Sequence, residues 1–343
     1  MFARLAMLAL AAGAGQLSFP LGKAPPRIEQ PRAPVQTAGP AFARACKDWD
    51  DWDKAAPPVR IHANTYLVGT CGISSILITG TDGHILIDGG TEAGADLIAE
   101  NIRRLGFNLR DVRILLHSHE HFDHVGGIAR LQQLSGAQLF ASAPAAKVFE
   151  TGTAGAGDPQ AGMHKPFPAA KVDRVIRDGE SVRLGNLMLT AVATPGHTPG
   201  ALSWHWVSCD GGVCRSIVYA DSLSPVSRDD YRFSDHPGYV AAFRASIAKV
   251  AALDCEILVT PHPSASGMIK RMAARSFDEE NGCRNYAASL TKALDERLAK
   301  EADPARNGEG DHPEDGGGGG VQGSEPPPSA AGAAATSPSR GGR

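Results

Sequence analysis

The sequence predicts one large domain in which strands alternate with helices, an α/β or layered α+β fold. Between about residues 42 and 302, apolar runs of strand length alternate with stretches of helical periodicity. Histidine-rich polar clusters follow the ends of several predicted strands, where such folds place their sites. This span of roughly 260 residues is long enough for a single domain with a full core.

The predicted elements follow one another through this span. The Asp82-Gly83 pair, between two apolar runs, is a strong hairpin signal. The predicted strands are 59–68 (one or two strands), 74–78, 84–88, 112–116, 139–141, 181–184, 188–192, 203–207, 216–220 and 256–260. The predicted helices are 93–105, 125–134, 239–253 and 277–300.

The two ends of the chain differ from this span. Residues 1–14 have a short basic start, an apolar run too short to cross a membrane, and small residues, which is typical of a secretory signal peptide. Residues 15–41 are rich in proline and read as a linker, and 303–343 are rich in Gly, Pro and Ala and are predicted to be disordered. A bacterial chain of this kind is expected in the periplasm. The net charge of −3 gives no indication of a nucleic-acid or anionic-membrane partner.

The chain has six cysteines: Cys46, Cys71, Cys209, Cys214, Cys255 and Cys283. An even number in an exported chain favours disulfides, although six cysteines allow 15 pairings. The chain has no Cys-x-x-Cys pair, which argues against a cysteine zinc cluster.

The strongest functional signal is a run of histidines. Four of the 12 histidines lie within eight residues, 117–124, directly after a buried strand, and Asp123 lies among them. Imidazole and carboxylate together suit zinc. His197 and His262 lie in Pro- and Gly-rich loops after other predicted strands, and each alone is weak evidence. Together with the run they provide the separated ligands that a closed site needs.

The sequence His119-Glu120-His121-Phe122-Asp123-His124 resembles the signature of the metallo-β-lactamase superfamily. The resemblance spans about residues 65–301 and implies a single-domain, four-layer αββα sandwich with two zinc ions in a groove at one edge. It assigns His119, His121 and His197 to the first zinc, and Asp123, His124 and His262 to the second. Asp88 would support the site from behind the ligands. His117 falls outside this register.

Further residues resemble the third β-lactamase subclass. The stretch from Ala220 to Ser224 has no cysteine ligand, and Ser222 and Ser224 match residues that bind the substrate carboxylate. A polar turn is the alternative reading of these serines. The same resemblance implies the disulfides Cys46–Cys71, Cys209–Cys214 and Cys255–Cys283.

The implied activity is hydrolysis of the amide bond of penicillins, cephalosporins and carbapenems by a zinc-bound hydroxide. Asp123 would orient the hydroxide and relay its proton. Phe122 is expected to pack near the site, and Glu120 to face solvent or a second polar partner. The segment 150–168 reads as a mobile loop bordering the groove. Gln160 is a candidate substrate contact, and Tyr231 is a weaker candidate for the rim.

Two other functions remain open. The first is another hydrolase of the same superfamily, such as a lactonase, a phosphodiesterase or a thioesterase like glyoxalase II. These commonly place an aspartate between the metals near position 221, and Asp221 is available for that role. The second is an exported zinc-storage protein, although two three-ligand sets with open positions suit catalysis better. The expected partner is a small β-lactam, and the expected state is a monomer.

Overall fold

The computed structural model describes residues 38–46 and 51–303, and its fold is built on two β-sheets. The first sheet has the order β1-β2-β3-β4-β5-β6-β7, antiparallel up to β4 and parallel from β4 to β7. Its strands are Val59–His62, Thr65–Leu67, Ile76–Thr79, His84–Ile87, Val112–Leu116, Gln138–Ser142 and Val172–Ile176.

The second sheet has the order β12-β11-β10-β9-β8 and is antiparallel except for the β11–β12 pair. Its strands, from β8 to β12, are Ser181–Leu184, Leu187–Ala193, Leu202–Asp210, Val213–Tyr219 and Ile257–Val259. The helices α1 to α8 are Ala38–Ala45, Gly94–Arg104, Phe122–Val125, Ile128–Ser135, Ala143–Thr151, Pro237–Ala252, Met268–Ala273 and Gly282–Ala302.

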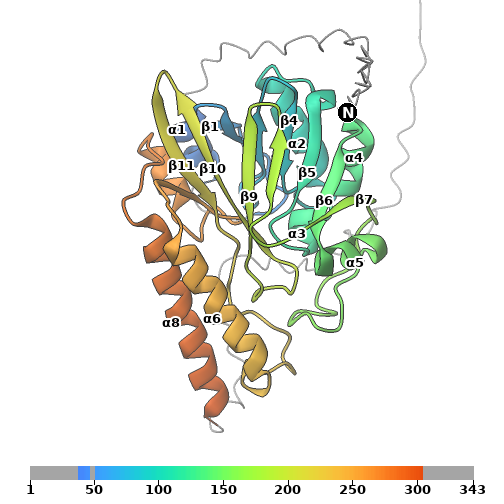
Figure 1. Ribbon diagram of the computed structural model, residues 1–343, viewed down its shortest axis with the longest axis vertical. Helices are drawn as coiled ribbons and strands as arrows, with labels where there is room; N and C mark the ends of the chain where they lie inside the picture. The colour runs from blue at the N-terminus through green and yellow to red at the C-terminus, as the bar shows by residue number, and fades with distance from the viewer. Residues whose placement is uncertain (1–37, 47–50, 304–343) are drawn as a thin grey trace, which may run out of the picture.

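Three apolar clusters show how these elements are layered. In β3, Ile76 and Ile78 belong to a cluster shared with Trp204 and Tyr219 of the other sheet, so the two sheets pack face to face. Leu77, between them in sequence, points to the other face and packs in the cluster that contains α2 and α4. A third cluster joins β11 and β12 to α6 and α8. The layers are therefore helix, sheet, sheet, helix, as predicted, and Figure 1 shows α6 and α8 side by side on the outer side of the second sheet.

The structure differs from the predicted elements in five places. Helix α1 begins at Ala38, inside the segment 15–41 predicted as linker, and α5, α7 and β7 have no counterpart in the prediction. The predicted helix 125–134 is two helices, α3 and α4, separated at Gly126 and Gly127. At the break, the N–H of Gly127 donates to the carbonyl of Gly90 (3.0 Å), and a Cβ at Gly127 would collide with the carbonyl oxygen of Gly89, so this close approach of the backbone requires glycine.

The three disulfides are those that the resemblance predicts. Cys46–Cys71 ties α1 to the loop after β2, and Cys255–Cys283 ties the start of α8 to the residues before β12. Cys209–Cys214 joins directly opposed residues of β10 and β11. The predicted signal peptide, and the tail beyond Asp303, lie outside the described residues.

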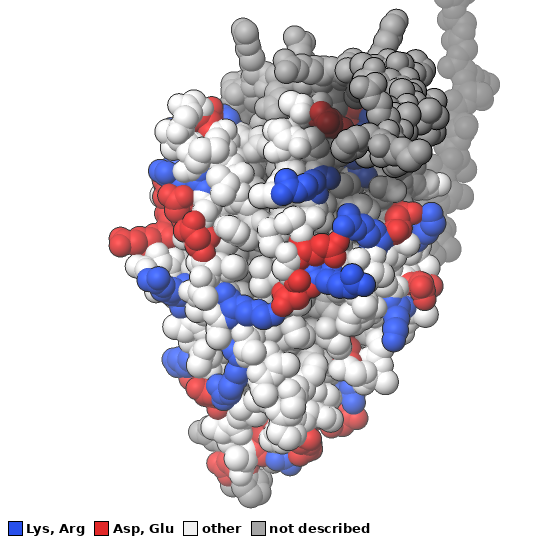
Figure 2. Space-filling model, in the orientation of Figure 1, with Lys and Arg blue, Asp and Glu red and all other residues white. Residues whose placement is uncertain are grey.

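The outer surface carries charges of both signs. Figure 2 shows lysine and arginine interspersed with aspartate and glutamate over the face in view, rather than gathered into a patch of one sign. None of the helices in residues 38–46 and 51–303 is long and apolar enough to cross a membrane.

Candidate metal centre

The predicted site residues meet at one end of the sandwich, where strands of both sheets end. The run His119–His124 follows β5 of the first sheet. His197 follows β9 and His262 follows β12, both in the second sheet. The centre is thus assembled from segments far apart in sequence, between the two sheets.

His119, His121 and His197 form one group. They are all buried, and each offers a ring nitrogen within 4.8 Å of the others. Their ring centroids are 4.7–5.0 Å apart, and the rings are close to perpendicular. Three imidazoles that converge in this way suit a tetrahedral metal with one position left open.

Asp123, His124 and His262 form a second group beside the first. His124 Nε2 lies 3.0 Å from Asp123 Oδ2 and 3.2 Å from His262 Nε2. His262 Nε2 lies 3.5 Å from the same carboxylate oxygen. His119, Asp123 and His124 also have ligand atoms within 4.8 Å of one another, so the two groups are contiguous.

In the first group, each ring uses its outer nitrogen for a protein partner. His119 Nδ1 lies 2.8 Å from Asp221 Oδ1, and His121 Nε2 lies 3.1 Å from Asp158 Oδ2. His197 Nδ1 lies 3.0 Å from the carbonyl oxygen of Ser224. Such partners fix the tautomer and leave the inner nitrogen with a lone pair for a metal.

The second group has a similar arrangement. His262 Nδ1 lies 3.1 Å from the carbonyl oxygen of Gly72, whereas His124 Nδ1 lies 3.7 Å from Asp88 Oδ2, within ion-pair distance but not hydrogen-bonded. The Nε2 atoms of the two rings therefore face each other, a contact that a proton or a cation must mediate. In the first group the Nε2 of His119 is buried with no hydrogen-bond partner. These inner nitrogens fit bound metal ions.

Asp88 holds the second group from behind. Its carboxylate accepts hydrogen bonds from Ser118 N (2.6 Å), Ser118 Oγ (2.7 Å) and Tyr219 OH (2.7 Å). Its backbone has φ +64°, a left-handed conformation uncommon for a residue other than glycine. This conformation places the carboxylate of the residue after β4 beneath His124.

Burial and charge favour the metal-binding protonation states of four of the six candidate ligands. Burial, with neighbouring histidines, lowers the pKa of His119 and His197, and burial lowers that of His262 to about 4. Burial would raise the pKa of Asp123, but His124 and His262 lower it further, so its carboxylate is ionised. Neutral imidazole and ionised carboxylate are the forms that bind metal.

At His121 and His124 the effect of burial is outweighed by neighbouring carboxylates. Asp158 raises the pKa of His121, and Asp123 raises that of His124 to about 10. A metal would therefore displace a proton at each of these two rings.

The surroundings of the groups are unusually acidic for a buried region. Asp88, Glu120, Asp123, Asp158 and Asp221 are all at most 4% exposed. The ion pairs that four of them make are with histidines of the two groups. Buried carboxylates are costly unless positive charge lies nearby. Bound divalent cations would supply that charge.

Glu120 faces a protein partner rather than solvent. It is 1% exposed, and its carboxylate accepts hydrogen bonds from Thr198 Oγ1 and Gly200 N, each at 2.7 Å. Phe122 packs near the site, with its ring centroid 5.0 Å from that of His164. Both arrangements agree with the sequence expectation, since Glu120 takes the second of its two expected environments.

His117 lies outside the two groups. Its Nε2 accepts a hydrogen bond from the backbone N–H of Ser142 (3.1 Å), and its ring packs against Phe149. Burial lowers its pKa to about 4, so it is a neutral, structural histidine. The alignment of the motif, which begins at His119, therefore agrees with the structure in leaving His117 out of the ligand groups.

The candidate substrate residues lie beside the first group. Ser224 Oγ is 3.1 Å from His197 Nδ1, and Ser222 is 6% exposed with an Oγ that has no hydrogen-bond partner. Gln160 Nε2 lies 3.4 Å from His197 Nε2. Tyr231, by contrast, packs in the apolar cluster beneath α6 and α8, where its ring stacks on that of His236.

Three residues near the site were missed by sequence reasoning. Asp158 orients His121, and His164 lies 3.1 Å from Gln160 Oε1 with its ring 5.4 Å from that of His121. Trp52 packs its ring 5.5 Å from Phe122 and 6.1 Å from His262. Asp158 and His164 both lie in a long loop between α5 and β7, and neither occurs in a motif that would have indicated it.

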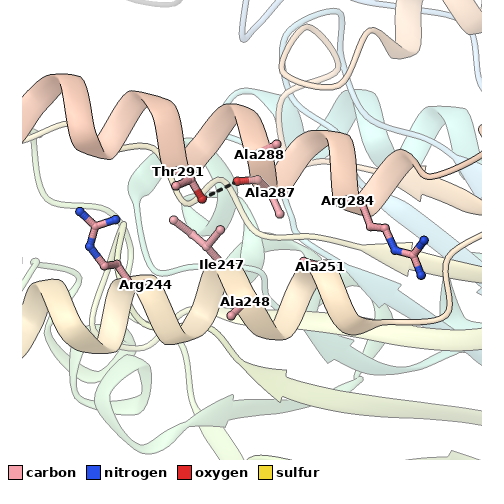
Figure 3. Close-up of a pocket in the computed structure, with 8 residues that line it drawn as sticks. All are labelled: Arg244, Ile247, Ala248, Ala251, Arg284, Ala287, Ala288 and Thr291. Atoms are coloured by element: carbon pink, nitrogen blue, oxygen red, sulfur yellow. Dashed lines mark hydrogen bonds between the residues drawn. The ribbon is translucent and has the colours of Figure 1, made fainter.

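A separate pocket lies between α6 and α8. It has a volume of about 360 Å³ and is lined by Arg244, Ile247, Ala248, Ala251, Arg284, Ala287, Ala288 and Thr291. Figure 3 shows the small side chains of the two helices facing each other, with an arginine toward each end. None of the predicted site residues lines this pocket, so it is not an extension of the metal centre.

Comparison with known proteins agrees with this geometry. Residues 68–262, more than half of the chain, match the family model of the metallo-β-lactamase superfamily. The chain belongs to the metallo-β-lactamase superfamily. The match ends at His262 and includes every residue of the two groups.

Solved structures narrow the resemblance within the superfamily. The chain is 55% identical to the MIM-2 metallo-β-lactamase, over 77% of this chain and 98% of that one, with a TM-score of 0.74. It is 44% identical to MEM-A1, a subclass B3 metallo-β-lactamase from a soil metagenome library, over 74% of this chain and 99% of that one (TM-score 0.71). The resemblance to the third subclass is therefore confirmed.

The first curated relatives match a smaller part of this chain than the solved structures do. A hydroxyacylglutathione hydrolase of Methylobacterium nodulans is 34% identical over 106 residues, which is 31% of this chain and 32% of that protein. The chain spans about a third to a half of the length of the first curated relatives it matches.

Proposed function

We propose that this superfamily member is an exported zinc-dependent β-lactamase that hydrolyses the amide bond of penicillins, cephalosporins and carbapenems, and so confers antibiotic resistance. The observation that carries the proposal is the pair of contiguous, buried ligand groups. Their fold has solved relatives named metallo-β-lactamases at up to 55% identity.

His119, His121 and His197 would hold the first zinc, and Asp123, His124 and His262 the second. Bound zinc supplies a nucleophile from water near neutral pH and polarises the substrate carbonyl. Two metals are supported by the acidity of the buried surroundings, because a single divalent ion would leave most of the five carboxylates uncompensated.

The residues of the chain would perform the remaining steps. Asp123 would accept a proton from the attacking water and pass it on toward the leaving nitrogen, a role that its ionised carboxylate supports. Ser222 and Ser224 would donate hydrogen bonds to the carboxylate of the substrate. The Ser222 hydroxyl is suited to this because it is buried without a partner. Gln160 would contact the substrate beside His197.

Export to the periplasm is supported by the cysteines. All six form disulfides, which persist in oxidising compartments and are rare in the bacterial cytosol. The predicted signal peptide at 1–14 agrees with export. The periplasm is also the compartment in which a β-lactamase would meet its substrates.

A thioesterase is the second candidate, favoured by the partial matches to hydroxyacylglutathione hydrolases. The position of Asp221 supports β-lactamase activity instead. Its Oδ1 is hydrogen-bonded to the outer nitrogen of His119, Nδ1, and its Oδ2 accepts a hydrogen bond from Leu223 N at 3.4 Å. Asp221 is thus engaged behind a ligand, whereas the alternative needs an aspartate between the metals.

The deciding experiment is hydrolysis of imipenem and nitrocefin by the purified mature protein, beside S-lactoylglutathione and a lactone. We expect β-lactam turnover that is lost with EDTA, restored by zinc and lost in His121→Ala. His117→Phe is the matched control, because His117 lies outside both ligand groups. Hydrolysis of the thioester alone, or β-lactam turnover that survives both EDTA and His121→Ala, would contradict the proposal.

A further inference from the structure

We propose that Glu120 is a positioning residue that fixes the three ligands of the first metal relative to one another. The inference rests on the proposed metal site. Glu120 lies between His119 and His121 in sequence, while its carboxylate binds the loop that carries His197. One side chain therefore connects the two segments that must meet for the first ligand set to close.

The backbone of the motif points Glu120 away from the metal. The chain is extended at His121 (φ −81°, ψ 152°), and successive side chains of an extended chain alternate in direction. His119 and His121 converge on the first group, so Glu120 between them points to the opposite side. There it reaches Thr198 and Gly200, one and three residues beyond His197.

The contact is a double, charge-assisted hydrogen bond in a fully buried place. Oε2 accepts from Thr198 Oγ1 and Oε1 accepts from Gly200 N, both at 2.7 Å. Hydrogen bonds to an ionised acceptor are about twice as strong as neutral ones, and two of them fix direction as well as distance. This pair holds the loop at two points close to the ligand.

The loop is built to receive the carboxylate. A Cβ on Gly200 would lie 2.7–2.8 Å from both oxygens of Glu120 and 2.7 Å from Ala145 N, so only glycine allows this approach. The carbonyl of Gly200 accepts from Ser142 Oγ (2.6 Å), and Leu202 N donates to the carbonyl of Ser118 (2.6 Å). The far end of the loop is therefore anchored independently, and Glu120 sets the part nearest His197.

The bonds of Glu120 are distinct from those of Asp158 and Asp221. Those two each orient a single ring, His121 and His119, through its outer nitrogen. Glu120 touches none of the three rings by hydrogen bond among those the structure shows, and acts on the spacing between segments. Its loss should weaken the first metal while leaving each ring's own partner in place.

The test compares Glu120→Ala, Glu120→Gln and Thr198→Val with wild type and with Glu150→Gln, a surface control on α5. Glutamine keeps both bonds, because its Oε1 accepts from Gly200 N and its amide donates to Thr198 Oγ1. The readouts are zinc affinity by competition with a chromophoric chelator, the visible spectrum of the cobalt-substituted protein, and the melting temperature of the metal-free protein.

We expect Glu120→Ala to weaken the first zinc by about 10- to 100-fold and to change the cobalt spectrum, as loss of the groups that support metal ligands commonly does. Thr198→Val, which removes one bond, should have a smaller effect. Glu120→Gln, which keeps both bonds but loses the charge, should retain more of the affinity and the spectrum than Glu120→Ala does. If Glu120→Ala fails to fold, Thr198→Val and Glu120→Gln still give the ordering.

Two results would overturn the inference. One is wild-type zinc affinity and cobalt spectrum in folded Glu120→Ala, whatever its melting temperature, because that makes the residue merely structural. The other is a loss in Glu120→Gln as large as in Glu120→Ala. None of the readouts uses β-lactam turnover. A wild-type protein that binds zinc but hydrolyses no β-lactam would therefore contradict the proposed function without contradicting this inference.

Discussion

Replacing Asp221 by asparagine separates the two hydrolase functions most directly. The carboxylate is fully buried and lies 2.8 Å from His119 Nδ1. The carboxamide has nearly the same shape, and its oxygen still accepts from that nitrogen. The substitution therefore removes the charge of the acceptor and keeps the hydrogen bond to His119, although the amide group replaces the oxygen that accepts from Leu223 N at 3.4 Å.

The size of the effect follows from that exchange. A hydrogen bond to a charged group contributes about 1.5–3 kcal/mol and a neutral one about 0.5–1.5 kcal/mol, so the difference is about 1–1.5 kcal/mol. This corresponds to roughly a tenfold weaker first metal. The metal-free protein should be little destabilised, because the lost bond from Leu223 N is long and because the charge is costly where burial raises the pKa of Asp221 to about 7.

The assay is a stepwise zinc titration against a chromophoric chelator, with β-lactam turnover measured at saturating zinc. Asp229→Asn, an exposed position in the same region of the chain, is the matched control. We expect one zinc to weaken about tenfold and turnover at saturation to stay within about tenfold of wild type. Loss of both zinc ions together, with turnover abolished at any zinc concentration, would mean that Asp221 lies between the metals, and would refute the reasoning.

Three further predictions follow from other parts of the structure. Ser224→Ala should raise KM for carboxylate-bearing β-lactams by about tenfold with little change in kcat, since one hydrogen bond to a charged group is lost; an unchanged KM would contradict the role of Ser224. His164→Ala should release the side chain of Gln160 and raise KM, with zinc stoichiometry unchanged as measured by metal analysis; loss of zinc would contradict this. Glu301→Gln should lower the melting temperature at pH 7 and have a smaller effect at acidic pH, below the folded pKa of Glu301. Burial raises the pKa of Glu301, but hydrogen bonds from Ser234, Phe233 and Arg297 lower it below its usual value, so the stabilisation is present above about pH 4.5 and is lost as pH falls through the folded pKa. Equal destabilisation at both pH values, in thermal melts, would contradict that account.

Much of the fold could be predicted because its buried strands are short, apolar and punctuated by turns. The strands of the first sheet up to β6 were predicted within a few residues. β7 was not, because Val172–Ile176 is an edge strand with three exposed residues at its centre and lacks the apolar run. The break between α3 and α4 was missed because it depends on the backbone of Gly89, which is distant in sequence.

The candidate metal ligands could be identified from the sequence because metal chemistry restricts residue type and spacing. The residues that hold those ligands could not, because any nearby acceptor can orient an imidazole. Asp158 is one aspartate in a loop without periodicity, and only the fold places it 3.1 Å from His121. Glu120 lies between two candidate ligands in the sequence, but its role could not be predicted, because its partners Thr198 and Gly200 lie in a loop distant in sequence.

The placement of the ligands at the ends of both sheets has a consequence for how the protein matures. A ribosome releases the chain from its N-terminus, so the histidine run emerges long before its partners. His262 lies 138 residues after His124, with all five strands of the second sheet between them. A half-made chain would offer a metal ion only an incomplete ligand set. Tight metal binding is therefore expected only in chains in which both sheets have docked, so that the metal would bind the finished fold rather than guide its early steps.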